Sequence, residues 1–282
     1  MIEQLWLFHC GWIRVPRSAI VAGANISFPR MPMLAALAFH TEHGPILVDA
    51  PFGHEGPSNS GSIVGATLRM AGWKFENDWS IVPRLEQLGF RPSEVHHILM
   101  THLHWDHTGG MKELGHARFH ISRSEWEFAT DLKPLDAIKR GYQPDDFRAM
   151  RNRVELIDDP LAIGEMPAGE ELTGEDIFGD GSIEAVGLPG HTIGHLGYRL
   201  TLGDGRTIFL VGDAAYCVEH IIERRSLGPM PRGIAYSLEQ AQSTLRALRL
   251  YHDEHPNHVM VPAHDFEWGE RCLDGPTPLH RV

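Results

Sequence analysis

Short runs of apolar residues, separated by turn residues, recur along most of this chain. Two pairs of runs have the pattern of β-hairpins: residues 34–39 with 46–48, and residues 196–202 with 207–211, each pair joined by a short turn that contains glycine. Glycine accepts a positive φ without steric cost, and tight turns between strands often require one. The pattern therefore predicts two antiparallel strand pairs.

Further apolar runs and two helical patterns complete the predicted framework. Short β-rich runs end at turn or polar residues at 98–101, 117–121, 183–186 and 258–262. One helix is predicted over 81–88 and another over 237–251, the second with Ser237 and Gln240 in a capping-box pattern. Mixed strands and helices with hairpins indicate an α+β fold in which helices flank two mixed sheets, rather than a purely parallel sheet.

No internal repeat or low-complexity tract divides the chain, so we expect a single domain over residues 1–282. Two segments, near 53–80 and 131–175, have weak periodicity and many Gly, Pro and charged residues. We interpret both as insertions of loops or short helices beside the functional site, because binding and catalytic residues often lie on such segments.

Composition and charge exclude several classes of function. The formal net charge is −12, whereas a protein that binds nucleic-acid phosphates needs clustered Lys and Arg. No apolar stretch approaches the roughly 18 residues of a membrane span, and Met1–Val21 lacks a signal-peptide pattern. The three cysteines are far apart, which fits a reducing compartment. We therefore expect a cytoplasmic protein that acts on a small molecule, with no nucleic-acid partner and no membrane span.

The densest group of reactive side chains lies in the segment Thr101-His102-Leu103-His104-Trp105-Asp106-His107. Four potential metal ligands, His102, His104, Asp106 and His107, follow directly after a predicted buried strand. On a continuing strand the first three would share one face and the fourth would point away, whereas a turn lets all four converge. Because imidazole is the commonest metal ligand among side chains, the segment predicts a metal site rather than a loop of solvated histidines.

Three more candidate ligands occur later in the chain, each after a β-rich run. They are His191, Asp213 and His264. Taken singly, each could be structural. A hydrolytic zinc ion keeps about three protein ligands and leaves one position for water. Because the candidate ligands together are too many for one such ion, we predict two metal ions.

The order of these motifs, HxHxDH followed by GH, GD and a late AH, resembles the metallo-β-lactamase superfamily over most of the chain, from Asp49 to Asp265. The resemblance implies an αββα sandwich with the site at one edge, between the sheets. It also implies the ligand sets: His102, His104 and His191 for one metal, Asp106, His107 and His264 for the second, and Asp213 as the bridge. Two bridged cations about 3.5 to 4 Å apart would share a hydroxide as nucleophile. We expect two divalent metal ions, zinc first, with iron, manganese or cobalt as alternatives.

Differences between this sequence and other branches of the superfamily narrow the range of expected functions. Zinc β-lactamases usually carry Cys near the position of Asp213, and the flavodiiron branch carries Glu where His104 stands here. Hydrolysis of a β-lactam drug and reduction of oxygen or nitric oxide are therefore not expected. Nucleases of the superfamily would want a basic surface, which the net charge does not indicate.

Tyr216 gives the most specific indication of a substrate. The chain is most similar to N-acyl homoserine lactonases, which place a Tyr three residues after the bridging Asp, and Tyr216 has this spacing from Asp213. The resemblance implies that its phenol donates a hydrogen bond to the oxyanion formed when hydroxide attacks a lactone or ester carbonyl. The alternative is a half-buried tyrosine that only packs. Asp49 and His195 are candidates for supporting the ligands through hydrogen bonds.

We therefore predict a dinuclear-metal hydrolase, similar to N-acyl homoserine lactonases, that cleaves a lactone or related carboxylic ester by metal-bound hydroxide. Asp106, which positions metal and water, and Tyr216 are its expected catalytic residues. Two alternatives stay open. A thioester hydrolase resembling glyoxalase II would share the ligands but needs a basic C-terminal patch, which Glu267, Glu270 and Asp274 do not provide. A metal-binding protein without turnover is the other alternative.

Overall fold

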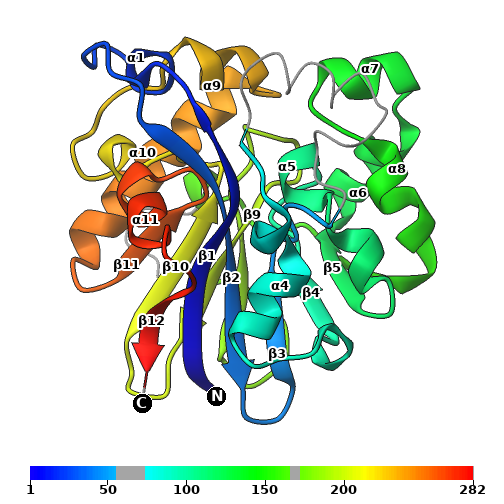
Figure 1. The fold of residues 1–282 in the computed structure, drawn as a ribbon. Helices are drawn as coiled ribbons and strands as arrows, with labels where there is room; N and C mark the ends of the chain where they lie inside the picture. Colours follow the sequence, from blue (N-terminus) through cyan, green and yellow to red (C-terminus); the bar gives the residue numbers. More distant parts are fainter. Residues whose placement is uncertain (55–73, 166–171, 282) are drawn as a thin grey trace.

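The computed structural model describes residues 1–54, 74–165 and 172–281. Its strands form two mixed sheets (Figure 1). The first has, in order across the sheet, β12 (Thr277–Arg281), β1 (Ile2–Arg14), β2 (Arg30–His40), β3 (Gly44–Val48), β4 (His97–Leu99), β5 (Arg118–Ser122) and β6 (Val154–Ile157). The second has β11 (Val259–Pro262), β10 (Thr207–Gly212), β9 (Leu196–Thr201), β8 (Ile183–Gly187) and β7 (Glu175–Asp176).

The type of strand pairing changes once across each sheet. In the first sheet β1, β2 and β3 pair antiparallel, whereas β3, β4, β5 and β6 pair parallel. In the second, only β10 and β11 pair parallel. Both predicted hairpins are confirmed, as β2 with β3 and as β9 with β10. The carboxyl ends of β3, β4, β10 and β11 therefore become available for a site built from loops.

The core consists of three layers, because each sheet buries both of its faces. Between the sheets, Ile46 and Val48 of β3 meet Ile208 and Leu210 of β10 in one apolar cluster. Leu47, which lies between Ile46 and Val48, belongs to a second apolar cluster on the outer face of the first sheet. Successive side chains of a strand point to opposite faces, so one strand contributes to two layers.

Helices cover both outer faces. They are α1 (Arg17–Ile20), α4 (Ile81–Gln87), α5 (Trp105–Thr108), α6 (Arg123–Asp131), α7 (Pro134–Lys139), α8 (Pro144–Phe147), α9 (Pro229–Ile234), α10 (Leu238–Glu254) and α11 (Phe266–Arg271). On α10, Leu245 and Leu248 pack with Phe209 of the second sheet. The Ser237 side chain accepts the Gln240 N–H at 3.3 Å, which confirms the predicted start of this helix. The arrangement is the expected αββα sandwich.

Several elements differ from the sequence prediction. Strand β1 was not predicted, although it is the longest strand of the first sheet and pairs with a neighbour on each side, β12 and β2. The segment 131–175, interpreted as loops and short helices, contains α7 and α8 but also strands β6 and the start of β7, which complete the sheet edges. Of the segment 53–80, residues 55–73 lie outside the described part of the chain, as do 166–171. Among the described residues, no helix is long and apolar enough to cross a membrane.

Candidate metal centre

The HxHxDH segment occupies the turn between β4, which ends at Leu99, and α5, which begins at Trp105. His102 and His104 precede the helix, and Asp106 and His107 lie in its only turn. All four side chains are buried, with 9% exposure for Asp106 as the highest value. The turn therefore brings adjacent polar residues to the end of a buried strand, as the sequence predicts.

The other three predicted ligands reach the same place from the second sheet. His191 lies between β8 and β9, Asp213 follows β10, and His264 follows β11. Because β10 and β11 are parallel neighbours, their carboxyl ends meet, and His264 Nε2 lies 3.1 Å from Asp213 Oδ2. Each of the three residues is at most 5% exposed. The site is thus assembled from loops of both sheets at one edge of the sandwich.

The seven side chains form overlapping groups whose potential ligand atoms lie within 4.8 Å of one another. These groups are His102 with His104 and His191, His102 with His107 and Asp213, and Asp106 with His107 and His264. The first and third groups are the two ligand sets that the resemblance implies. Asp213 lies between them, because Oδ1 is 3.4 Å from His107 Nε2 and Oδ2 is 3.3 Å from His191 Nε2.

The donor atoms fit metal ions better than they fit one another. His102 Nε2, His107 Nε2 and Asp213 Oδ1 are buried and have no hydrogen-bond partner. A buried polar atom without a partner costs about 1 to 3 kcal/mol, so unpaired atoms gathered in one place indicate a missing ligand. Imidazole nitrogens and carboxylate oxygens suit zinc and several other divalent transition metals.

In the first ligand group, the protonation states of the imidazoles also favour metal binding. Burial lowers the pKa values of His102 and His191 well below the ordinary value of a histidine side chain. It lowers the pKa of His104 to about 3. These imidazoles are neutral at pH 7, which is the form that can ligate a metal. Burial would raise the pKa of Asp213, but the neighbouring imidazoles, His264 first, hold it well below the ordinary value. The carboxylate between the two groups is therefore ionised.

Hydrogen bonds from residues outside the ligand groups orient the predicted ligands. Asp49, at the end of β3, lies 2.7 Å from His107 Nδ1 and also accepts the backbone N–H and the hydroxyl of Thr101 at 2.8 Å. His195 Nε2 accepts the Asp213 N–H at 3.0 Å. A Cβ on Gly212 would lie 2.7 Å from that Nε2 atom, so this position needs glycine. The supporting contacts predicted for Asp49 and His195 are therefore present.

Tyr216 is 3% exposed and lies beside both groups of ligands. The centre of its ring is 5.7 Å from that of His191 and 5.1 Å from that of His264. Burial, with Asp213 and Asp106 nearby, raises the pKa of Tyr216 well above its ordinary value. The phenol therefore keeps its proton and can donate a hydrogen bond at the site.

Two residues near the centre were not predicted from the sequence. The buried carboxylate of Glu125, on α6, accepts hydrogen bonds from Leu103 N–H and from the Tyr142 hydroxyl, both at 3.0 Å. Ser122 and Glu125 have the spacing of a capping box directly after a predicted strand, so a helix start was detectable there. No sequence signal indicated that the Glu125 side chain turns inward, or that Tyr142 joins it.

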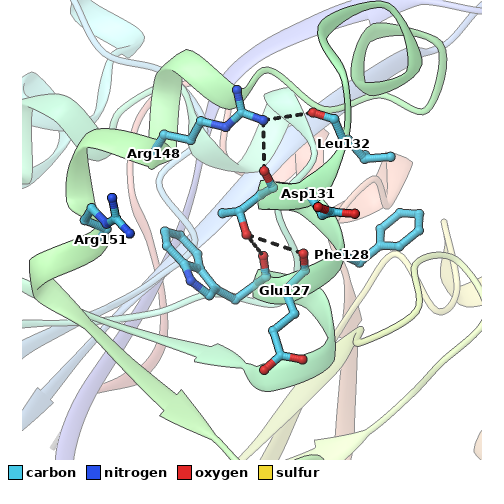
Figure 2. A pocket seen from close by; sticks show the side chains of 8 residues that line it. Glu127, Phe128, Asp131, Leu132, Arg148 and Arg151 are labelled. Carbon is cyan, nitrogen blue, oxygen red and sulfur yellow. Dashed lines mark hydrogen bonds between the residues drawn. The ribbon is translucent and has the colours of Figure 1, made fainter.

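A separate pocket of about 870 Å³ lies along α6 and the 3-10 helix over 148–153. Arg148 closes one end of α6 by donating to the carbonyls of Thr130 and Leu132 (Figure 2). Glu127 and Phe128 also line the pocket. Its described lining residues include none of the metal-ligand groups and no His or Cys, so we assign it no part in the chemistry.

An αββα sandwich whose loops gather His and Asp side chains at one edge defines a class of metal-dependent hydrolases. The family model of the metallo-beta-lactamase superfamily matches residues 44–264. The chain belongs to this superfamily, as the motifs predict.

Relatives and solved structures narrow the comparison. The N-acyl homoserine lactonase AttM of Agrobacterium fabrum is 28% identical over 228 residues, which cover 78% of this chain and 80% of the relative. A probable metallo-hydrolase of Mycobacterium tuberculosis is 28% identical over 240 residues, 81% of this chain and 73% of the relative.

Solved structures show the same fold. An N-acyl homoserine lactone hydrolase with the product N-hexanoyl-L-homoserine at its catalytic metal centre has a TM-score of 0.73 at 19% identity, covering 98% of this chain and 100% of that one. The dizinc quorum-quenching lactonase AidC has a TM-score of 0.63 at 13% identity, covering 100% of this chain and 97% of that one.

Proposed function

We propose that this protein is a single-domain, dinuclear-metal hydrolase that opens a lactone ring, with N-acyl homoserine lactones as its substrate class. The observation that carries the proposal is the position of Tyr216 beside His191 and His264, at the junction of the two ligand groups. The similarity to AttM supports the choice of lactone, since that relative is named an N-acyl homoserine lactonase.

The chain offers a complete donor set for two divalent cations, for which we propose zinc. The first would be held by His102, His104 and His191, the second by Asp106, His107 and His264, with Asp213 shared between them. When bound, two such cations lower the pKa of a water molecule and polarise the carbonyl that it attacks.

The protein's own side chains then supply orientation and charge stabilisation. The Tyr216 phenol, protonated because of its raised pKa, donates a hydrogen bond to the oxygen that becomes negative as the carbonyl is attacked. The Asp106 carboxylate, 3.6 Å from His264 Nε2, can accept a hydrogen bond from the attacking water and so orient it. Burial of the whole group strengthens these interactions, because charges interact more strongly where water is excluded.

A thioester substrate is not favoured by the C-terminal surface. Glu267 lies on α11 beside Arg271, its partner in an ion pair, and Glu270 pairs with Arg30 at 3.6 Å. The arginines of this surface are therefore already neutralised by neighbouring carboxylates, and no basic patch remains for an anionic thiol cofactor among these residues. We propose a cytoplasmic location, which fits three buried, unpaired cysteines.

The test is a substrate panel run on one preparation in three metal states. Protein as purified, metal-depleted protein and protein reconstituted with zinc are assayed with an N-acyl homoserine lactone, a thioester and a phosphodiester. We expect lactone hydrolysis that is lost on depletion and restored by zinc. Hydrolysis of the thioester or phosphodiester alone would overturn the substrate class, and an inert, metal-replete protein would leave a metal-binding role only.

A further inference from the structure

Glu125 is a fully buried carboxylate in the first turn of α6 that makes no ion pair with Lys or Arg among the described residues. Hydrogen-bond donors from both ligand loops and from Tyr142 surround it instead. Oε1 accepts from Leu103 N–H and from the Tyr142 hydroxyl, both at 3.0 Å, and Oε2 accepts from Gly194 N–H at 3.2 Å. Burying a charge is energetically costly unless the charge is fully hydrogen-bonded. The buried position of the Glu125 carboxylate therefore needs a physical explanation.

The two backbone donors belong to the two loops that carry the first ligand group. Leu103 lies between His102 and His104 in the turn after β4, whereas Gly194 lies three residues after His191 in the turn between β8 and β9. One loop extends from the first sheet and the other from the second. A single carboxylate therefore connects the sheets at the place where His104 Nδ1 and His191 Nε2 approach to 2.9 Å.

The third donor extends the connection to the segment that covers His104. Tyr142 forms an isolated β-bridge with His104, and the Gly141 carbonyl accepts Trp105 N–H at 2.9 Å. The Tyr142 ring lies edge-on to the His104 ring, with centres 4.8 Å apart. The same carboxylate thus holds the loop below His104 and the tyrosine beside it.

Close packing leaves the second loop little freedom to move. The Ser122 hydroxyl donates to the Gly194 carbonyl at 2.6 Å and accepts Glu125 N–H at 3.2 Å. A Cβ on Gly194 would lie 2.1 Å from that hydroxyl oxygen and 2.5 Å from the Glu125 nitrogen. The start of α6 therefore packs closely against this loop, with no room for a side chain at Gly194.

We propose that Glu125 is a positioning residue for the first metal site: its carboxylate sets the distance between the His102 and His104 loop and the His191 loop. The inference deepens the proposed function and rests on the site binding metal. Glutamate is required because each oxygen must accept from an N–H group. Glutamine would turn an NH₂ donor toward one of the two backbone donors, which would push that loop away.

The competing explanation is that Glu125 only stabilises the start of α6. The two explanations differ in what they predict for metal binding. A residue that only stabilises the helix would change the unfolding temperature of the metal-free protein and leave metal affinity and ligand geometry alone. A positioning residue changes the affinity of one metal site and the geometry around that metal.

The experiment compares Glu125→Gln with Glu127→Gln, a matched change two residues along the same helix at a side chain that is 65% exposed. Metal-free proteins are titrated with cobalt(II), and visible absorption reports the geometry at each site. For Glu125→Gln we expect one of two cobalt equivalents to bind about 10- to 100-fold more weakly with a shifted spectrum, the usual effect of losing an outer-shell partner. For Glu127→Gln we expect wild-type binding and spectra.

Wild-type cobalt affinity and spectra in a folded Glu125→Gln protein would overturn the proposal, even if its unfolding temperature fell. If that variant does not fold, Glu125→Asp takes its place, because the shorter side chain withdraws the carboxylate from both loops without changing charge, and unaltered cobalt binding there has the same meaning. A wild-type protein that binds two cobalt ions but cleaves no lactone would refute the proposed function and leave this inference standing. An active wild-type protein, together with unchanged cobalt binding in Glu125→Gln, would refute this inference and leave the proposed function standing.

Discussion

Asp49 Oδ2 lies 2.7 Å from Nδ1 of His107. The contact directs the other ring nitrogen, Nε2, toward Asp213 Oδ1, 3.4 Å away. Asp49 adopts a φ of 61°, one of two positive values at non-glycine positions among the described residues. Such a conformation costs of order 1 to 3 kcal/mol and persists where surrounding contacts determine it, often at functional sites. Strain at the end of β3 thus accompanies the orientation of a predicted ligand.

Asp49→Asn should weaken metal binding while the fold is retained. Asn tolerates positive φ as well as Asp does, and its carbonyl can still accept from Thr101. Its NH₂ group cannot accept from His107, so the ring loses its orienting partner. We expect metal affinity about 10- to 100-fold lower, measured by competition with a chelator. Circular dichroism serves as the control for folding, and an unchanged affinity would show that His107 needs no support from Asp49.

Purified protein should contain close to two metal ions per chain. The reason is that the described residues provide two separate groups of ligand atoms joined through Asp213. Elemental analysis of protein purified without added metal gives the number and identity of the ions. Full activity with one bound metal, and no gain when more is added, contradicts a bridged site.

His104→Ala should lower metal content and activity together, whereas His258→Ala should change neither. His104 lies within the first ligand group, but His258 lies beyond the end of α10, where its Nδ1 is 2.7 Å from the Tyr251 hydroxyl. Both variants remove an imidazole, so they form a matched pair. Elemental analysis and steady-state kinetics on both variants test this prediction. Equal losses of metal and activity in the two variants would mean that His104 contributes no more to metal binding than a histidine outside the ligand groups.

Tyr216→Phe should retain both metals and the fold but lower kcat. A hydrogen bond made mainly to the transition state is lost, while the bound metals still polarise the carbonyl. The loss should therefore stay below the roughly 100- to 1000-fold seen when an oxyanion donor is removed from a site without such a backup. Steady-state kinetics on an N-acyl homoserine lactone measures it. An unchanged kcat in the metal-replete variant would reduce Tyr216 to packing.

Asp180 should make the stability of the protein depend on pH far from the metal centre. Partial burial raises the pKa of Asp180, but hydrogen bonds from Ser182 and His40 outweigh it and hold the pKa well below its ordinary value. In the unfolded chain this pKa is about 3.9. The ionised carboxylate therefore stabilises the folded state above about pH 4, and this contribution is lost as the pH falls toward the folded-state pKa.

For that reason, Asp180→Asn should lower the unfolding temperature near neutral pH, and its difference from wild type should shrink as the pH falls from about 5 to about 3. Metal-free protein is used for both, so that acid release of metal does not contribute. Thermal unfolding followed by circular dichroism gives the difference. A constant difference across this range would show that ionisation of Asp180 does not contribute to stability.

Features that depend on neighbours in the chain were predictable from the sequence. The β9 and β10 hairpin follows from two apolar runs around a glycine turn, and the start of α10 follows from Ser237. The ligand turn after β4 was predictable for the same reason, because four ligand types in six positions at a strand end leave few other interpretations. That these side chains bind metal stays a prediction, whereas the structure shows that they converge.

Only the tertiary structure brings together residues that no local pattern connects. Glu125 and Tyr142 belong to segments without a metal-binding motif, and they reach the His102 to His104 loop because α6 packs where the two sheets meet. Strand β1 buries apolar residues on both faces of the first sheet, which removes the simple alternation that would reveal a strand. Local sequence determines which atoms can be donors and ligands, whereas long-range packing determines which of them face one another.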